Sequence, residues 1–109
     1  MHHTFAAAKS DDHAGAVTLS LAGDLDADAS AALDVLIINA VGQGGVRNLI
    51  VDLRGVSFLD AAGVRALIGA RQAALRHGAA LHLTNAKGIV LQVLRIVGLD
   101  PIHHSPAEP

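Results

Sequence analysis

Residues 48–53 read Asn-Leu-Ile-Val-Asp-Leu, and this short run constrains the fold of the chain more than any other segment. A nearly continuous stretch of β-branched residues and leucine is typical of a strand that is covered on both faces. Apolar residues with helical spacing lie on either side of it, after Asp26 and after Asp60. The strand is therefore predicted to be central in a layered α/β fold.

Three segments have the apolar spacing of helices, and each is followed by a glycine that would end it. The third is apolar over most of its circumference, so we expect it to pack on more than one side. The three helices are expected from an N-cap at Asp26 or Asp28 to Gly42, from Asp60 to His77, and from Ala86 to Val97. Buried side chains of the second are expected at Val64, Leu67, Ile68 and Leu75.

Other segments have the patterns of strands. Residues 16–22 alternate between apolar and polar types, as in a strand with one buried face, and residues 80–84 follow the second helix. A weaker strand at 4–8 is joined to the first through the turn-rich segment 11–15, a spacing that suits an antiparallel hairpin. The later strands, which alternate with helices, are expected to be parallel and joined by right-handed crossovers.

These elements predict a single α/β domain over residues 1–109. Its mixed sheet should have four to five strands, packed with three to four helices. The core must be aliphatic, because Phe5 and Phe58 are the only aromatic residues. The ends of the chain, 1–3 and 103–109, are expected to fray.

The charge balance excludes several classes of partner. Eight basic and ten acidic side chains leave a net charge of -2, so there is no positive field to attract nucleic acid or an anionic membrane. No stretch approaches the roughly 20 apolar residues of a membrane span. The absence of cysteine excludes disulfides and thiolate metal sites and fits a reducing cytosol, so we expect a cytoplasmic protein.

The segment between the central strand and the second helix is the most informative for function. Asp60 can cap this helix by accepting a hydrogen bond from the amide of Ala62 or Gly63, which would stabilise it by about 1 kcal/mol. A glycine inside a helix costs roughly 1 kcal/mol relative to alanine. Close approach of a partner's backbone would explain why position 63 has no side chain.

Three motifs follow one another at compatible spacings. They are Gly-Asp-Leu-Asp at 23–26, Gly-Val-Ser-Phe-Leu-Asp at 55–60 with Gly63 and Val64 behind it, and Leu-Arg-Ile-Val-Gly-Leu-Asp at 94–100. In this order they resemble the STAS domains, and within that family the anti-sigma-factor antagonists. The resemblance extends over nearly the whole chain.

The resemblance also implies a binding site. In such antagonists, the second residue after the aspartate is the serine or threonine that a partner anti-sigma kinase phosphorylates, and here that position holds Ala62, which has no hydroxyl. Family members often have a small residue where this chain has Arg65, which alters the shape and charge of the docking face. The partner-binding residues implied are Asp24, Asp26, Ser57, Asp60, Ala61, Ala62, Gly63 and Arg65.

Some of these residues also have simpler explanations. Asp24 and Asp26 can cap the first helix or solvate a turn, alone or in addition to binding a partner. Ser57 can be an ordinary hydroxyl at the end of a strand. Phosphorylation of Ser57 is therefore not expected.

By this resemblance the chain is a non-catalytic interaction domain. It would act as an anti-sigma-factor antagonist or related partner-switching regulator, which binds an anti-sigma factor or an ATP-binding kinase domain without being phosphorylated at the helix start. One alternative is an accessory STAS subunit docked on the ATPase of a lipid-type ABC transporter. Another is a non-switching signalling scaffold, which would form homodimers through the last helix or a sheet edge.

An enzyme is not expected. The spacing of Asp24, Asp26, Asp52 and Asp60 pairs no nucleophile with a base and an orienting group. The histidines lack the spacing of a zinc site. The glycine-rich segment 42–45 lies between a helix and a strand, the reverse of the order that binds phosphates, so no cofactor is expected.

Overall fold

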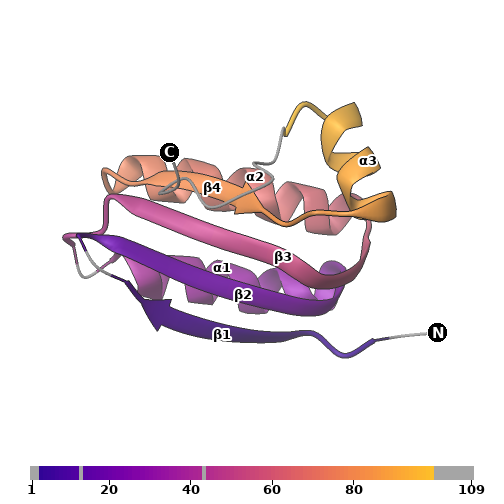
Figure 1. Cartoon of the computed structure of the whole chain (residues 1–109), viewed down its shortest axis with the longest axis horizontal. Helices are drawn as coiled ribbons and strands as arrows, with labels where there is room; N and C mark the ends of the chain where they lie inside the picture. Colours follow the sequence, from indigo (N-terminus) through magenta and orange to yellow (C-terminus); the bar gives the residue numbers. More distant parts are fainter. Residues whose placement is uncertain (1–2, 13, 43, 100–109) are drawn as a thin grey trace.

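The computed structural model of the chain describes residues 3–12, 14–42 and 44–99. In these ranges four strands and three helices follow one another (Figure 1). They are β1 (Ala6–Asp11), β2 (Ala16–Leu25), α1 (Ala27–Val41), β3 (Asn48–Leu59), α2 (Ala61–Arg76), β4 (Ala80–Thr84) and α3 (Gly88–Ile96). The predicted α/β class is confirmed.

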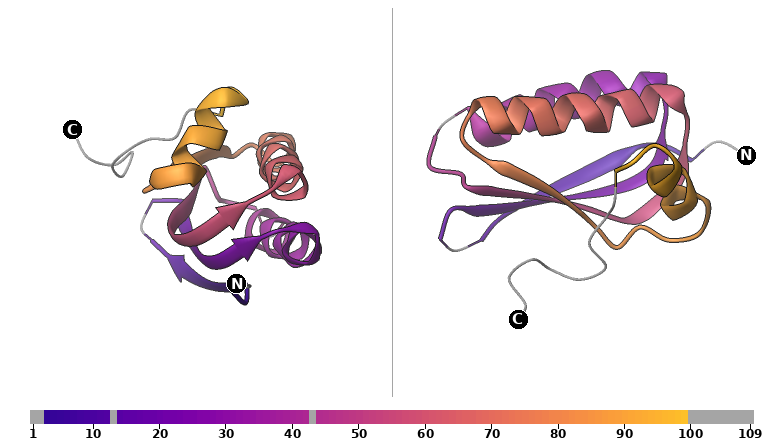
Figure 2. Two further views of the ribbon diagram at one scale, coloured as in Figure 1. Left: turned by 90° about the vertical axis from the view of Figure 1, so that its right-hand side faces the viewer. Right: turned by 90° about the horizontal axis from the view of Figure 1, so that it is seen from above.

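The sheet has the strand order β1-β2-β3-β4, in which β1 is antiparallel to β2 and the other pairs are parallel. The predicted mixed sheet with an initial hairpin is therefore confirmed. Because the strand order rises steadily from β2 to β4, right-handed crossovers place α1 and α2 on the same face of the sheet. Figure 2 shows the two helices side by side on that face.

The central strand β3 is covered differently from the prediction. Leu49, Val51 and Leu53 are buried, whereas Ile50 and Asp52 between them are only half-buried. The prediction of a strand covered on both faces is wrong, because both crossover helices lie on one side of the sheet (Figure 2). Its central position is confirmed.

The core is aliphatic, as its composition predicts. The helix α2 contributes mainly small side chains to it, since Ala70, Ala73 and Ala74 are buried. Leu75, which was predicted to be buried, is 62% exposed because it lies outside this alanine face. The largest fully buried side chains include Leu19, Leu21, Leu25, Leu33, Ile37, Leu49, Leu53, Leu67 and Leu94.

The hairpin strand β1 begins and ends later than the predicted strand at 4–8. The turn after it is tight because Ala14 and Gly15 adopt left-handed conformations, with φ of 62° and 79°. Pairing with β2 therefore continues to Asp11. His13, which was also expected in the turn, lies outside the described residues.

Both β2 and β3 run further than predicted. Two register shifts in their ladder each add one residue to β3 relative to β2, as in β-bulges. Arg54 and Gly55 interrupt the apolar pattern of β3, which is why the sequence predicts its end at residue 53. The extension places Leu25 opposite Leu59, so the two strands end side by side.

The helix α3 is shorter and more exposed than predicted. It covers nine residues from Gly88 to Ile96. Val90 and Leu94 are buried, whereas Ile89 and Ile96 are 57% and 83% exposed. The prediction that this helix packs on more than one side is wrong, because only one of its faces reaches the core.

The ends of the chain were expected to fray. Of the two expected tails the structure describes only His3, which donates its main-chain N–H to the carboxylate of Asp24 at 2.9 Å, and fraying of the ends stays a prediction. Residues 103–109, the other expected tail, lie outside the described residues. In the described part of the chain, no helix has the length and hydropathy needed to cross a membrane.

Candidate partner-binding site

The start of α2 is capped by Asp60, as predicted. Asp60 has an extended backbone (φ -106°, ψ -173°), and its carboxylate accepts a hydrogen bond from the amide of Gly63 at 2.9 Å. Its carbonyl accepts the first helical bond from the amide of Val64 at 2.9 Å. The cap leaves the amides of Ala61 and Ala62 at the positive end of the helix dipole.

The start of α1 lies beside the start of α2, because Leu25 pairs with Leu59 and each leucine precedes a cap. Asp26 caps α1 through a hydrogen bond from the amide of Ala29 at 3.1 Å. The capping role expected for Asp26 is thus observed. Two helix N-termini meet at this edge of the sheet.

Gly63 packs against the end of β2. A Cβ at this position would collide with the carbonyl oxygen of Leu25, well inside the 3.0 Å that real Cβ atoms respect. The close approach predicted from this glycine is therefore real, but the neighbour is the chain's own strand. The expectation that a partner's backbone explains Gly63 is wrong.

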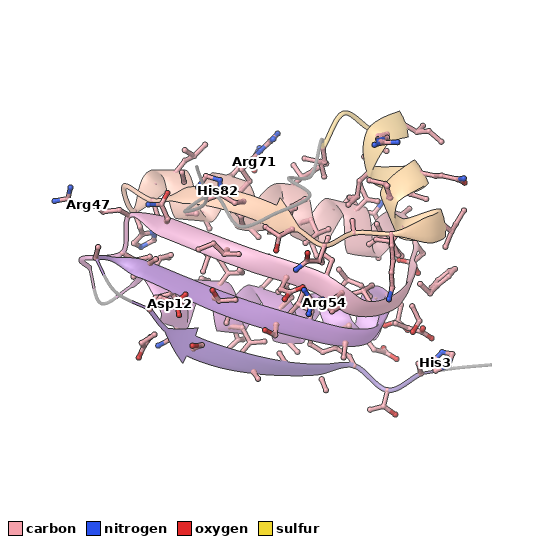
Figure 3. The ribbon with its side chains drawn as sticks, in the orientation of Figure 1. His3, Asp12, Arg47, Arg54, Arg71 and His82 are labelled. Carbon is pink, nitrogen blue, oxygen red and sulfur yellow. The ribbon has the colours of Figure 1, made fainter. Side chains whose placement is uncertain are left out.

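Asp24 lies inside the molecule, with only 6% of its surface exposed. Besides the main-chain bond from His3, its carboxylate lies 3.5 Å from the ring Nδ1 of that histidine. Figure 3 shows His3 at the N-terminal end of the described chain, beyond β1. The amide of Asp24 donates in turn to the carbonyl of His3 at 3.0 Å. Asp24 thus faces the chain's own N-terminal segment.

The remaining predicted site residues lie at or just before the first turns of α2. Ala61 and Arg65 are exposed and Ala62 is half-buried. Ser57 is exposed on β3, next to Phe58, which pairs with Asp24. The structure therefore brings the predicted residues to one edge of the sheet, while the side chain of Asp24 is buried there.

One part of this surface was not predicted. An open groove of 490 Å³ lies between the first turn of α2 and the helix α3, lined mostly by apolar side chains. Val64 and Val93 line it from the two helices, and Val97 is 45% exposed at its edge. The sequence signal for this groove is the apolar excess of α3, which by itself predicts packing inside the molecule.

A second hollow, of 390 Å³, lies on the other side of the same turn, between α1 and α2. Ala62 and Arg65 line it from α2. No group of three histidine, aspartate or glutamate side chains in residues 3–12, 14–42 and 44–99 is placed to hold a metal ion. The site is a capped helix start between two hollows.

Comparisons with known proteins agree with this architecture. The chain is 26% identical to the anti-sigma factor antagonist SpoIIAA in its unphosphorylated form, with a TM-score of 0.75 over 86% of this chain and 82% of that one. The Bacillus cell fate determinant SpoIIAA in the phosphorylated form gives the same identity, 26%, with a TM-score of 0.69 over 86% and 85% of the two chains.

A third similar structure is part of a much larger protein. The murine anion transporter Slc26a9, in its inward-facing state, is 24% identical, with a TM-score of 0.70. The match covers 80% of this chain but 14% of that one, and it concerns the fold. The STAS domain family itself matches residues 6–108. This chain therefore belongs to the STAS domain family.

Proposed function

We propose that this chain is a partner-switching regulator of the anti-sigma-factor antagonist type. It binds an anti-sigma factor or a related ATP-binding kinase domain through the surface at the start of α2, and it is not phosphorylated there. The observation that carries the proposal is Ala62, two residues after the cap Asp60, in a STAS chain that is 26% identical to SpoIIAA.

A helix start of this kind suits a phosphate switch. Amides that have no partner in the first turn, together with the helix dipole, favour negative charge. A phosphate adds roughly two negative charges, so its addition changes what the surface can bind. Ala62 keeps the helix start and removes the acceptor oxygen. Phosphorylation at this position therefore cannot release the partner.

The apolar groove between α2 and α3 supports binding that does not depend on phosphate. Val64, Val93 and Val97 offer apolar surface beside the capped helix start. Phe58, which is 48% exposed at the end of β3, is a further large apolar side chain near this edge. Arg65 on the rim suits an acidic side chain of the partner. Ser57, Asp26 and Ala61 would border the contact.

The test is a phosphorylation and binding assay with the anti-sigma kinase of the same organism and ATP. The wild-type chain is expected to bind the kinase and to gain no phosphate at the start of α2. Ala62→Ser is expected to gain one phosphate and then to release the kinase. Ala61→Ser, which adds a hydroxyl one position away, serves as the control and should remain unlabelled. The proposal is contradicted if the wild-type chain does not bind the kinase, or if Ala62→Ser binds the kinase and gains no phosphate.

A second candidate function has its own support. Ala62 removes the need for a kinase, and the same fold forms part of an anion transporter. The chain would then be an accessory subunit that docks on the ATPase of a transporter, such as a lipid-type ABC system. Affinity capture followed by mass spectrometry separates the two candidates, because the first predicts recovery of a kinase and the second recovery of a transporter ATPase.

A further inference from the structure

The two helices that cover the sheet have charges of opposite sign. The charged side chains of α1 are Asp28 and Asp34, and those of α2 are Arg65, Arg71 and Arg76. All five are exposed, and no ion pair between two described residues involves them. Three of them lie toward the gap between the helices, Asp34 from α1 and Arg65 and Arg76 from α2, so this gap has an acidic side chain on one helix and basic side chains on the other.

A furrow separates the two helices on this face. It consists of two hollows, of 390 and 260 Å³, which share Asp34 from α1 and Gly69 from α2. Arg65 lines the first hollow and Arg76 the second, so an arginine stands toward each end of the furrow. At Gly69 a Cβ would meet no atom within 4 Å, so the middle of the furrow is open.

We propose that this face, which we call the α1–α2 face, binds a second copy of the chain. The two copies would be related by a two-fold axis that runs parallel to the helices, in the plane between the copies. Since α1 and α2 run side by side in the same direction (Figures 1 and 2), this rotation places α1 of each copy over α2 of the other. The contact is self-complementary, so each acidic helix meets one basic helix and this pairing occurs twice in the dimer.

The position of Asp34 fits this arrangement closely. A rotation about an axis along the helices does not change the position of a residue along that axis. Asp34 and Gly69 lie at the same position along it, since both line the two hollows. Asp34 of one copy would therefore enter the open middle of the other copy's furrow, between Arg65 and Arg76. A two-fold axis perpendicular to the helices would instead place α1 on α1, so that Asp34 of one copy would lie near Asp34 of the other. Charge selects the first arrangement.

The size of the face sets the strength of the association. Helices of 15 and 16 residues are roughly 22–24 Å long, and packed helices lie about 8–10 Å apart. The face therefore measures roughly 450 Å² per copy, against about 800 Å² per partner in a stable interface. The dimer is expected to be weak and to depend on concentration. Because its charges are exposed, it should also weaken at high salt.

The test is sedimentation velocity of the whole chain from about 10 μM to about 1 mM, at low and high salt. The wild-type mass is expected to rise from monomer towards dimer, and less so at high salt. Asp34→Arg and Arg76→Asp should each weaken self-association by roughly tenfold. Arg54→Asp makes the same charge change as Arg76→Asp, but on β3, on the sheet face that the helices do not cover (Figure 3). It should have no effect on self-association.

Mixing the two variants keeps the proposal testable if either one is altered in another way. A mixture of Asp34→Arg with Arg76→Asp should form a mixed dimer, because the new arginine of one chain meets the new aspartate of the other. Unfolded variants would not recover in this way. The proposal is overturned if the wild-type chain stays monomeric throughout, if it dimerises equally well with either charge reversed, or if the mixture does not associate.

Discussion

The junctions β2–α1 and β3–α2 are built alike, yet they differ at two positions. Each reads Leu-Asp-Ala, at 25–27 and at 59–61. Each aspartate is extended and caps its helix through the amide three residues on, at 3.1 Å for Asp26 and 2.9 Å for Asp60. The same local sequence therefore gives the same local structure twice.

The first difference is at the capped amide, which belongs to Ala29 in α1 and to Gly63 in α2. Only Gly63 lies against the carbonyl of Leu25, so only α2 excludes a side chain there. The second is one residue earlier, where α1 has Asp28 and α2 has Ala62. The position that favours negative charge has a carboxylate in α1 and an uncharged side chain in α2. Packing explains the glycine, and function is the question at Ala62.

The largest effect is expected from exchanging the residues at the capped amides. Gly63→Ala introduces a methyl group against main-chain atoms of β2, which cannot move aside without shifting the strand. We expect it to lower the free energy of unfolding by about 3 kcal/mol. Ala29→Gly in α1 removes one buried methyl group and adds backbone freedom, so it should cost about 1–2 kcal/mol. Urea unfolding followed by circular dichroism measures both.

Gly69→Ala is the matched control for this exchange. It makes the same substitution in the same helix, at a position where the added Cβ meets no atom within 4 Å. It is expected to raise the free energy of unfolding by about 0.5–1 kcal/mol, because alanine is the better helix former. If Gly63→Ala were as well tolerated as Gly69→Ala, the close packing of β2 on α2 would be wrong.

A smaller and more equal effect is expected from removing the two caps. Asp26→Ala and Asp60→Ala each leave one helix amide without its side-chain acceptor, which costs about 1 kcal/mol. Asparagine is nearly as good a cap, so the Asp→Asn variants should lose only a few tenths of that. Thermal unfolding of the four variants tests whether the junctions are equivalent. If Asp60→Ala left the stability of the chain unchanged, the hydrogen bond from Gly63 to Asp60 would contribute nothing.

Most of the fold could be predicted because its signals are local. Alternating residues at 16–22, helical spacing after Asp26 and the cap at Asp60 each depend on neighbours in sequence. The family resemblance then supplied the candidate site at Ala62. These parts of the structure needed no knowledge of which distant residues meet.

The errors concern contacts between distant parts of the chain. The bulges that extend β3 past Arg54 depend on its pairing with β2, which periodicity cannot reveal. The exposure of Leu75 depends on which face of α2 the sheet covers. Apolar composition alone made α3 look like a buried helix, although Ile96 faces outward. The groove beside α2 was missed for the same reason.

The smallest effect is expected from exchanging the charge at the second helical position. Ala62→Asp places a carboxylate at the start of α2 and should stabilise the chain by about 0.3–1 kcal/mol, while Asp28→Ala should destabilise it by a similar amount. Both changes should shrink at high salt, and the double variant should return close to wild type, since the positions lie on different helices. Guanidinium is itself a salt, so urea titrations at low and high sodium chloride are the suitable measurement. A destabilising Ala62→Asp would mean that this helix start does not favour negative charge, and it would remove the physical reason for regarding Ala62 as a lost phosphate site.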